Sequence, residues 1–473
     1  MALHGVNPYL PSWEYVPDGE PHVFGDRVYV YGSHDFFNGH VFCLGDYVCY
    51  SAALDDLGTW KYEGVIYKKT DDPLNPAGDM CLYAPDVTRG PDGRYYLYYV
   101  LDKVNVVSVA VCDSPAGKYE FYGYVRHADG SRLGERAGDE PQFDPAVITE
   151  GDATWLYTGF CPRGDRSRTG PMVIGLGPDM ISITQETKTV LPSAPYNTKE
   201  GPYKGHEFFE APSIRKKGDL YYFVYSSIVF HELCYATSRH PDRDFEYRGV
   251  IVSNADIGID SWKPADKAGY YGGNNHGGMV EVQGSWYIFY HRHTNATMFS
   301  RQTCFEAIEI LEDGSIPQVE MTSSAPNGSP LPGRGRYPAY IACNLFCKEK
   351  ASYSEMYDGR FPRITQDGRD GDEVEGYIAN MMEGAVAGFK YFDMKGVTGI
   401  EIETRGYGNG EFLVKTTWDG AVLARIPVEF TNVWKPFKSS ITIPDGVHAL
   451  YLEYSGGGRI ALGSFSLIVE AEQ

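Results

Sequence analysis

The sequence of 473 residues lacks the features that mark several classes of protein. Its 42 lysine and arginine residues are outnumbered by 63 aspartate and glutamate residues, so the net charge is −21 and no basic excess is left for nucleic acid or an anionic membrane. It also has no run of about 20 apolar residues that could span a membrane. These absences exclude nucleic acid and membranes as expected partners, whereas the acidic balance suits a neutral ligand such as a sugar.

The nine cysteines form no paired metal-binding pattern. Their number is odd and they are scattered, and Cys343 and Cys347 lie four residues apart without a second pair. We therefore expect reduced thiols in a cytosolic protein. Residues 1–21 have neither the basic region nor the apolar region of a signal peptide, which also favours a cytoplasmic location.

The residues that are abundant indicate an all-β protein. The sequence holds 54 glycines and 29 prolines, which implies many turns, and 37 tyrosines, a residue type common in strands and in sugar-stacking surfaces. A chain of this length exceeds one ordinary hydrophobic core, so two domains are expected.

A repeat runs through the first two thirds of the chain. Each of five segments opens with a polar residue, continues with a short apolar strand, and reaches a turn glycine seven or eight residues later, before an aromatic-rich strand. Successive opening residues lie 58 to 68 residues apart, which is room for about four strands, or one propeller blade. The repeat therefore predicts a five-bladed β-propeller. The opening residues are Asp18, Asp86, Asp144, Glu210 and His276.

The opening residues are expected to meet at the propeller axis, because the first strand of every blade lines the central channel. Carboxylates buried without partners are costly, so their convergence indicates a functional site. The alternative is that each is a turn or cap residue at a strand start. Asp86 is either substrate-binding or structural, and Glu200 or Glu207 would replace Glu210 if the start of the fourth blade were shifted.

A change of composition separates the last third of the chain. Residues 322–338 are rich in serine, proline and glycine and are interpreted as a linker. Residues 339–473 alternate apolar and polar positions in short runs, which predicts a β-sandwich. The predicted propeller then spans residues 1–321.

At this point the motifs resemble a known family. Residues 1–320 resemble glycoside hydrolase family 43, the arabinofuranosidases and β-xylosidases, and the motifs PDGEP, YAPDV, FDPAV, FFEAPSIRKKGDLYYFVYS and NNHGG follow the order of its blades. The last domain resembles, more weakly, a family 6-type carbohydrate-binding module. The resemblance implies hydrolysis with inversion of configuration.

The resemblance also implies roles for particular residues. Asp18 would be the general base and Glu210 the general acid, while Asp144 would orient the acid and tune its pKa. His276 matches a residue in the central channel, beside a calcium ion or a water molecule. Arg301 matches a substrate-binding arginine. Two structural interpretations stay open. His276 is also interpretable as a core histidine, and Arg301 as the partner of a structural carboxylate.

Two departures from the family pattern bear on the sugar that is bound. The first motif is PDGEP instead of PDPS, and Tyr83 stands where many members carry tryptophan, so Tyr83 is a candidate substrate-binding residue. Four further residues follow the first or the last blade strands and are interpreted either as pocket lining or as surface loop. They are His34, Asp35, His291 and His293.

The predicted function is an exo-acting glycosidase that removes terminal α-L-arabinofuranosyl or β-D-xylosyl residues from hemicellulose-derived oligosaccharides. No cofactor is expected for the chemistry. The alternatives are a non-catalytic sugar-binding propeller, a hydrolase of another glycoside, and a protein-interaction propeller. A fructosidase is disfavoured because its WMNDPNG and RDP signatures are missing. The last domain either binds sugar through an aromatic such as Trp418, Trp434 or Tyr451 or is structural.

Overall fold

The computed structural model describes residues 5–196, 198–260, 263–347 and 358–469. Within these ranges the chain is all-β, with strands β1–β31 and four short 3-10 turns. None of the nine cysteines, all of which lie in these ranges, forms a disulfide. The described residues contain no helix that is long and apolar enough to cross a membrane.

Residues 20–189 form three four-stranded antiparallel sheets that follow one another along the chain. The first contains β1 (Glu20–Phe24), β2 (Arg27–Tyr31), β3 (Tyr47–Ala53) and β4 (Asp56–Tyr67). The second contains β5 (Asp86–Arg89), β6 (Tyr95–Tyr99), β7 (Ser108–Cys112) and β8 (Glu120–Tyr124). The third contains β9 (Ala146–Glu150), β10 (Ala153–Thr158), β11 (Met172–Leu176) and β12 (Ile183–Thr189).

Two further antiparallel sheets complete this part of the molecule. The fourth contains β13 (Phe208–Lys217), β14 (Leu220–Ser227), β15 (Glu232–Ser238) and β16 (Glu246–Ser253). The fifth has only three strands, β17 (Met279–Val282), β18 (Ser285–His293) and β19 (Arg301–Ile308). Asn7 lies at its outer edge, where the side chain donates to the Phe305 carbonyl at 2.8 Å and accepts from the Phe305 N–H at 3.2 Å.

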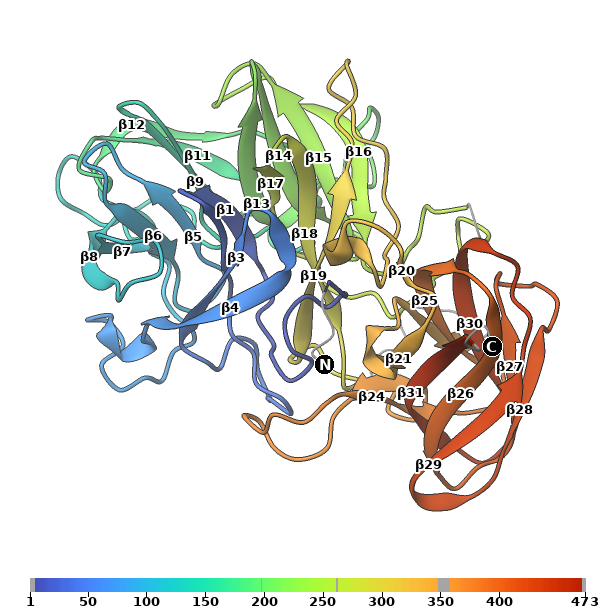
Figure 1. Cartoon of the computed structure of the whole chain (residues 1–473). Helices are drawn as coiled ribbons and strands as arrows, with labels where there is room; N and C mark the ends of the chain where they lie inside the picture. Colours follow the sequence, from blue (N-terminus) through green and yellow to red (C-terminus); the bar gives the residue numbers. More distant parts are fainter. Residues whose placement is uncertain (1–4, 197, 261–262, 348–357, 470–473) are drawn as a thin grey trace.

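The first strands of the five sheets form a closed ring. β1, β5, β9, β13 and β17 each contact the next, and β17 contacts β1. A parallel bridge between Gly19 and Gly277 joins the fifth sheet to the first. Figure 1 shows the sheets radiating from these strands, from blue to yellow. Residues at the starts of the five strands therefore face one central space.

The turn glycines predicted from the repeat lie in the tight hairpins between the first and second strands of each sheet. All five have a left-handed backbone, with φ between 59° and 86°, a conformation that a side chain on Cβ disfavours. Because each hairpin is tight, the aromatic second strand folds back on the first and packs into the core between neighbouring sheets. These glycines are Gly25, Gly93, Gly151, Gly218 and Gly284.

The last third of the chain forms two six-stranded sheets (Figure 1, orange and red). One contains β20 (Leu331–Pro332), β22 (Asn344–Cys347), β25 (Ala385–Met394), β27 (Asn409–Lys415), β28 (Ala424–Val428) and β30 (Gly446–Gly457). The other contains β21 (Gly335–Pro338), β23 (Arg363–Thr365), β24 (Tyr377–Met381), β26 (Val397–Gly406), β29 (Thr431–Ser440) and β31 (Ile460–Val469). Buried Phe389, Phe412 and Phe465 belong to the core of this domain.

The stretch 322–338, interpreted above as a linker, contains two of these strands. β20 pairs with β25, and β21 pairs with β31. Its second half is therefore hydrogen-bonded into the C-terminal sheets. The serine, proline and glycine content did not indicate this pairing, because each strand is only two to four residues long.

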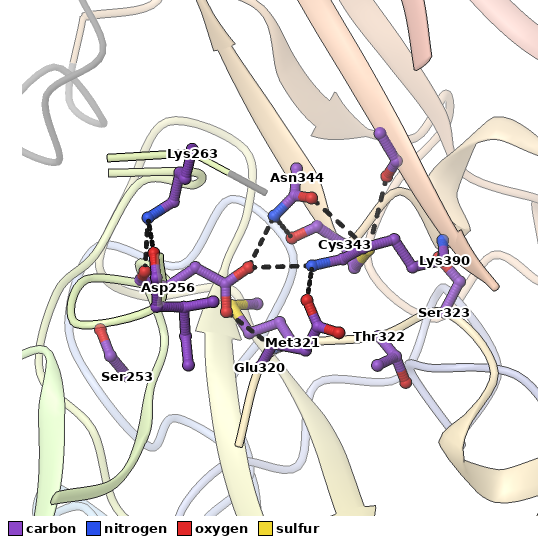
Figure 2. A network of polar contacts seen from close by, with 12 residues as sticks. Ser253, Asp256, Lys263, Glu320, Met321, Thr322, Ser323, Cys343, Asn344 and Lys390 are labelled. Atoms are coloured by element: carbon purple, nitrogen blue, oxygen red, sulfur yellow. Dashed lines mark hydrogen bonds and ion pairs between the residues drawn. The ribbon is translucent and has the colours of Figure 1, made fainter. Parts of the chain in front are cut away.

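A buried network of charged side chains joins the two parts of the chain (Figure 2). Lys390 of β25 donates to Glu320 at 2.9 Å and to Asp256 at 3.2 Å, and Asn344 donates to the same Asp256 oxygen at 2.8 Å. Lys390 and Asp256 are fully buried. Although burial alone lowers the pKa of Lys390, Asp256 and Glu320 raise that pKa well above its ordinary value, so the ammonium stays charged.

We expect Lys390→Met to destabilise the protein strongly. The substitution leaves Asp256 and Glu320 facing each other without their shared cation, and breaking a buried ion pair costs about 3–5 kcal/mol. Lys395→Met is the matched control, because Lys395 pairs with Asp393 at 2.8 Å while its side chain is 75% exposed. Calorimetric melting of both variants checks this. Equal melting temperatures would contradict the assigned importance of the network.

Candidate active site

A cavity of about 340 Å³ opens where the first strands of the sheets begin. It brings together six of the residues that the sequence marked as candidate site residues: Asp18, Tyr83, Asp144, Glu210, His276 and Arg301. The acids come from three different sheets, since Asp18 precedes β1, Asp144 precedes β9, and Glu210 lies in β13. A larger hollow of about 1070 Å³ near the junction of the two domains is lined by none of them.

Two of the acids adopt a backbone conformation that is uncommon for residues with a side chain. Asp18 has φ of 59° and Asp144 has φ of 47°, and Ala211, next to Glu210, has φ of 63°. Aspartate tolerates this left-handed region better than most residues, whereas alanine does not. Strain of this kind persists where the surrounding structure fixes it, and it gathers at functional sites.

Asp18 is held as a carboxylate by positive and hydrogen-bonding neighbours. Its Oδ1 accepts a hydrogen bond from Arg301 at 2.8 Å and lies 3.3 Å from His291 Nδ1. Burial alone would raise the pKa of Asp18, but Arg301 and His291 outweigh it and hold the pKa well below its usual range. Asp18 therefore remains ionised throughout the ordinary pH range.

Arg301 is fixed in place by a second carboxylate. Its Nε and a terminal nitrogen donate to the two oxygens of Asp35 at 2.8 and 3.0 Å, a two-point pairing that sets the plane of the guanidinium. The guanidinium also lies 4.8 Å from the ring centre of Phe42. Arg301 is 2% exposed, and Asp35, which the sequence left as pocket lining or surface loop, is buried beside it.

Glu210 and Asp144 have raised pKa values, in contrast to Asp18. Burial and the nearby charge of Asp18 raise the pKa of Glu210 to about 8, although Arg301 acts in the other direction. Burial and Glu210 also raise the pKa of Asp144, whose Oδ2 accepts the Ala211 N–H at 3.2 Å. That bond ties Asp144 to the strand that carries Glu210. One cavity thus holds an ionised Asp18 and a protonated Glu210 at neutral pH.

His276 lies beneath the acids and is neutral. Burial lowers its pKa to about 4, despite the nearby charge of Asp18. Its Nδ1 lies 3.9 Å from both Asp18 and Asp144, and its Nε2 lies 3.8 Å from Glu20 Oε1. That buried Glu20 oxygen has no hydrogen-bond partner in the described structure.

Asp86 lies outside the cavity lining, which favours the structural one of its two interpretations over the substrate-binding one. Its two oxygens accept from His22 Nε2 at 2.6 Å and from the Val147 N–H at 2.8 Å, and it is fully buried. The reason is register. Counted from the proline of each motif, Ala84 of APDV matches Asp144 of DPAV, and Ala84 does line the cavity. Asp86 is two residues further along the strand, on a deeper level of the channel.

Glu20, His22 and Asp86 form a cluster on that deeper level, and it already contains a cation. Arg215 donates to Glu20 Oε2 at 2.8 Å and lies 3.2 Å from His22 Nε2. The geometry of this cluster alone would suit a metal ion. Because the guanidinium of Arg215 supplies the positive charge, an additional metal ion does not fit between Glu20 Oε2, His22 and Asp86.

The remaining candidates lie outside the cavity lining. His34, interpreted from the sequence as pocket lining or surface loop, contacts the Asp46 carbonyl at 3.1 Å, lies 3.8 Å from Glu14 and is not part of the cavity lining. Glu207, an alternative acid, is buried and accepts from the backbone N–H groups of Thr198 and Gly205. Glu200, the other alternative, is exposed and outside the lining.

Sequence reasoning missed the aromatic wall of the cavity. The rings of Phe143, Phe160, Phe209 and Phe230 contact one another in succession, with centroids 4.6–5.3 Å apart. The sequence did contain a signal, because Phe143 and Phe209 each immediately precede a predicted acid. Apolar faces of sugars stack on such rings, so this wall suits a carbohydrate.

An ionised acid and a protonated acid that line one aromatic cavity, at the axis of a ring of sheets, are typical of a glycosidase site. The similarity of this chain to known proteins agrees with this class. The family model described as glycosyl hydrolases family 43 matches residues 18–316, and the chain belongs to that family. The protein is therefore a glycosidase.

Individual relatives support this placement. A "Xylosidase/arabinosidase" from Thermoclostridium stercorarium is 68% identical over 99% of this chain and 100% of its own length. A protein of the same name from Bacteroides ovatus is 30% identical over 66% of this chain and 97% of its own.

Two solved structures illustrate the fold. An arabinoxylan arabinofuranohydrolase of family 43 from Bacillus subtilis, in complex with cellotetraose, has a TM-score of 0.52 at 20% identity and covers 98% of this chain and 97% of its own. A family 43 β-xylosidase/α-arabinofuranosidase from a compost metagenome, in complex with xylotriose and in calcium-free form, has a TM-score of 0.51 at 26% identity. It covers 66% of this chain and 96% of its own. These structures place the chain among propeller folds with an added sheet domain.

Proposed function

We propose that this glycosidase removes single terminal β-D-xylosyl and α-L-arabinofuranosyl residues from xylan-derived oligosaccharides, with inversion of configuration. The observation that carries the proposal is the opposite pKa displacement of Asp18 and Glu210 within one cavity. The names of the two relatives above point to these two sugars. A cavity of about 340 Å³ lies at the small end of ligand pockets, which suits a single terminal sugar.

Asp18 is the proposed general base. An ionised carboxylate can accept a proton from water as that water attacks the anomeric carbon. Arg301 and His291 keep Asp18 charged, and Arg301 also fixes where the carboxylate points. In an inverting enzyme the attacking water enters from the face of the sugar opposite the leaving group, so base and acid must stand on different sides of the cavity. Here they come from the first and the fourth sheets, which we take as blades of a five-bladed propeller.

Glu210 is the proposed general acid. With its pKa raised to about 8, it holds a proton at neutral pH that it can transfer to the glycosidic oxygen as that bond breaks. Asp144 helps to orient the acid, because it accepts the N–H of Ala211, the residue next to Glu210. The water oxygen thereby bonds to the anomeric carbon as the glycosidic bond breaks. One proton of that water passes to Asp18, and the proton of Glu210 passes to the leaving oxygen.

The substrate assignment is tested by hydrolysis of p-nitrophenyl β-D-xylopyranoside and p-nitrophenyl α-L-arabinofuranoside side by side, with xylotriose as a natural substrate. Release of nitrophenol from both glycosides, and of xylose as the first product from xylotriose, would support the proposal. Cleavage of neither glycoside, with sugar binding retained, would favour the non-catalytic alternative.

We expect kcat/KM to fall as the pH rises through about 8. Glu210 must be protonated to act as the acid, and its pKa is raised to about 8, so deprotonation above this value removes activity. The pKa of Asp18 lies far lower, so activity should persist well into the acidic range. The profile of kcat/KM against pH checks this, and an alkaline limb that persists unchanged in Glu210→Gln would contradict it.

No cofactor takes part in this mechanism, and a channel cation is proposed only as a structural group. An ion between His276 Nε2 and the unpartnered Glu20 Oε1, which lie 3.8 Å apart, would take its remaining ligands from water, and the family resemblance points to calcium as that ion. Such an ion would add positive charge below the acids without touching the reacting bond. A rise of the melting temperature with added calcium that is lost in Glu20→Gln would support it. The same melting temperature with calcium and with a chelator would overturn it.

The three aromatic residues that the sequence offered as sugar-binding candidates in the C-terminal domain pack against that domain instead. Tyr451 is buried, Trp418 stacks on Phe346 with centroids 4.1 Å apart, and Trp434 packs against Tyr377. These contacts favour the structural interpretation of those residues.

A further inference from the structure

The C-terminal domain reaches the loops at the rim of the cavity. Two loops, called the rim loops here, comprise residues 35–43 between β2 and β3 and residues 294–300 between β18 and β19. One stretch of the C-terminal domain, residues 364–376, covers the end of β23 and the loop before β24, and it contacts both loops and the N-terminal residues beside them. We call it the buttress segment.

The buttress segment first contacts the second rim loop through Asn295. The Asn295 N–H donates to the Ile364 carbonyl at 2.7 Å, and the Thr365 hydroxyl bonds Asn295 Oδ1 at 2.8 Å. The Asn295 amide in turn donates to Asn38 Oδ1 at 2.7 Å, in the first rim loop. Asn295 therefore connects the C-terminal domain to both rim loops.

The buttress segment also contacts the first rim loop and the residues under it. Asp370 Oδ1 accepts the Phe37 N–H at 2.6 Å, and Gln366 Oε1 accepts the Tyr15 hydroxyl at 2.6 Å. The rings of Tyr15 and Phe37 stack with centroids 6.1 Å apart. The Tyr15 carbonyl accepts the Asp35 N–H at 2.9 Å, and Phe37 is two residues after Asp35. Both hydrogen bonds from the buttress segment therefore reach residues close to Asp35.

The rim loops carry groups that belong to the cavity. Asp35 holds Arg301, which in turn contacts Asp18. Phe42 lies under the Arg301 guanidinium, and Met298 and Phe42 both line the cavity. Phe42 packs edge-on against Phe299 of the other rim loop, with centroids 4.8 Å apart. A shift of the rim loops would therefore move Arg301 and one wall of the cavity.

The domain that bears the buttress segment is itself anchored to the propeller. The Lys390 network holds β25 to residues 256 and 320 (Figure 2). Arg292 of β18, which is almost fully buried, donates to the carbonyls of Tyr340 and Ala342 at 2.6 and 2.7 Å. A firmly anchored domain can hold a loop in one position, which a domain on a loose tether could not.

We infer that the C-terminal domain is part of the catalytic apparatus, with Asp370 acting as a positioning residue that holds the first rim loop, and through it Asp35 and Arg301, in place for the substrate. The inference rests on the proposed function for the identity of the substrate only. The contacts that carry it concern the loops themselves.

The test compares Asp370→Ala with Asp370→Asn, which keeps an oxygen able to accept the Phe37 N–H. Asp445→Ala is the matched control, because exposed Asp445 also accepts one backbone N–H, that of Gly396 at 2.9 Å, within the C-terminal domain. Kinetics on p-nitrophenyl glycosides, the pH profile, and deuterium exchange of the full-length protein are measured for all three. Exchange reports on the rim loops whether or not the enzyme cleaves a given glycoside.

We expect Asp370→Ala to lower kcat/KM about tenfold, mainly through KM, because misplacement of a substrate-positioning group weakens productive binding. The alkaline limb should move to higher pH, since Arg301 lowers the pKa of Glu210. Amides of residues 35–43 should exchange roughly tenfold faster, as expected for loss of one hydrogen bond to a carboxylate. Asp370→Asn should restore most of each effect, and Asp445→Ala should show none.

Two outcomes would overturn the inference. One is unchanged exchange of residues 35–43 in Asp370→Ala. The other is faster exchange with kinetics and pH profile like those of the wild type, because the loop would then be held without consequence for the site. A wild-type enzyme that cleaves neither glycoside would instead count against the proposed function, and exchange would still decide whether the buttress segment holds the loop.

Discussion

Replacing Glu210 with glutamine lowers kcat/KM by about 10²–10⁴-fold for a glycoside with a poor leaving group and far less for a dinitrophenyl glycoside. The physical reason is that glutamine preserves the shape of Glu210 but cannot give a proton to the departing oxygen. A dinitrophenolate leaves without that proton. The measurement is kcat/KM of wild type and variant across a series of aryl glycosides with different leaving-group pKa values.

Glu207→Gln is the control for this series. Glu207 is a buried glutamate three residues before Glu210, and it accepts backbone N–H groups outside the cavity. Its variant should keep wild-type dependence on the leaving group. A Glu210→Gln enzyme that loses activity equally for good and poor leaving groups would show that Glu210 does not protonate the leaving oxygen.

Replacing Asp18 with asparagine should lower kcat by about 10³–10⁴-fold for every leaving group alike. Asparagine cannot accept the proton of the attacking water, and good leaving groups do not relieve that need. The change also removes one carboxylate from Arg301, which keeps both oxygens of Asp35. Arg301 therefore remains paired, so a collapse of the fold is not expected.

Asp72→Asn is the matched control for Asp18→Asn. Asp72 is a fully buried aspartate that accepts the Leu74 N–H at 2.8 Å and the Tyr99 hydroxyl at 2.7 Å, away from the cavity. Its variant should lose stability but keep its turnover per folded molecule. Near-normal turnover in Asp18→Asn would mean that another group activates the water.

The sequence was sufficient to predict the acids because the repeat marks them. A polar residue at the start of each repeat, a fixed distance before a turn glycine, predicts which side chains share the axis, and the structure brings Asp18, Asp144, Glu210 and His276 together. The repeat misplaced Asp86, because the distance to the glycine tolerates a shift of two residues along a strand. Counted from the prolines of APDV and DPAV, Ala84 rather than Asp86 matches Asp144.

The rest of the site depends on contacts between residues far apart in the sequence. Asp35 and Arg301 are 266 residues apart, and Phe37 and Asp370 are 333 residues apart, so no local pattern relates them. The same holds for the junction, where Lys390 and Asp256 pair across the two parts of the chain. A single sequence displays periodicity within elements but not which distant side chains meet.

The most direct test of the account is the anomeric configuration of the first-formed product, followed by ¹H NMR during hydrolysis of a p-nitrophenyl xyloside. Asp18 as base and Glu210 as acid predict inversion, so α-xylose should appear first from a β-xyloside and then mutarotate. Initial release of β-xylose would contradict the account, because retention requires a carboxylate that attacks the sugar itself.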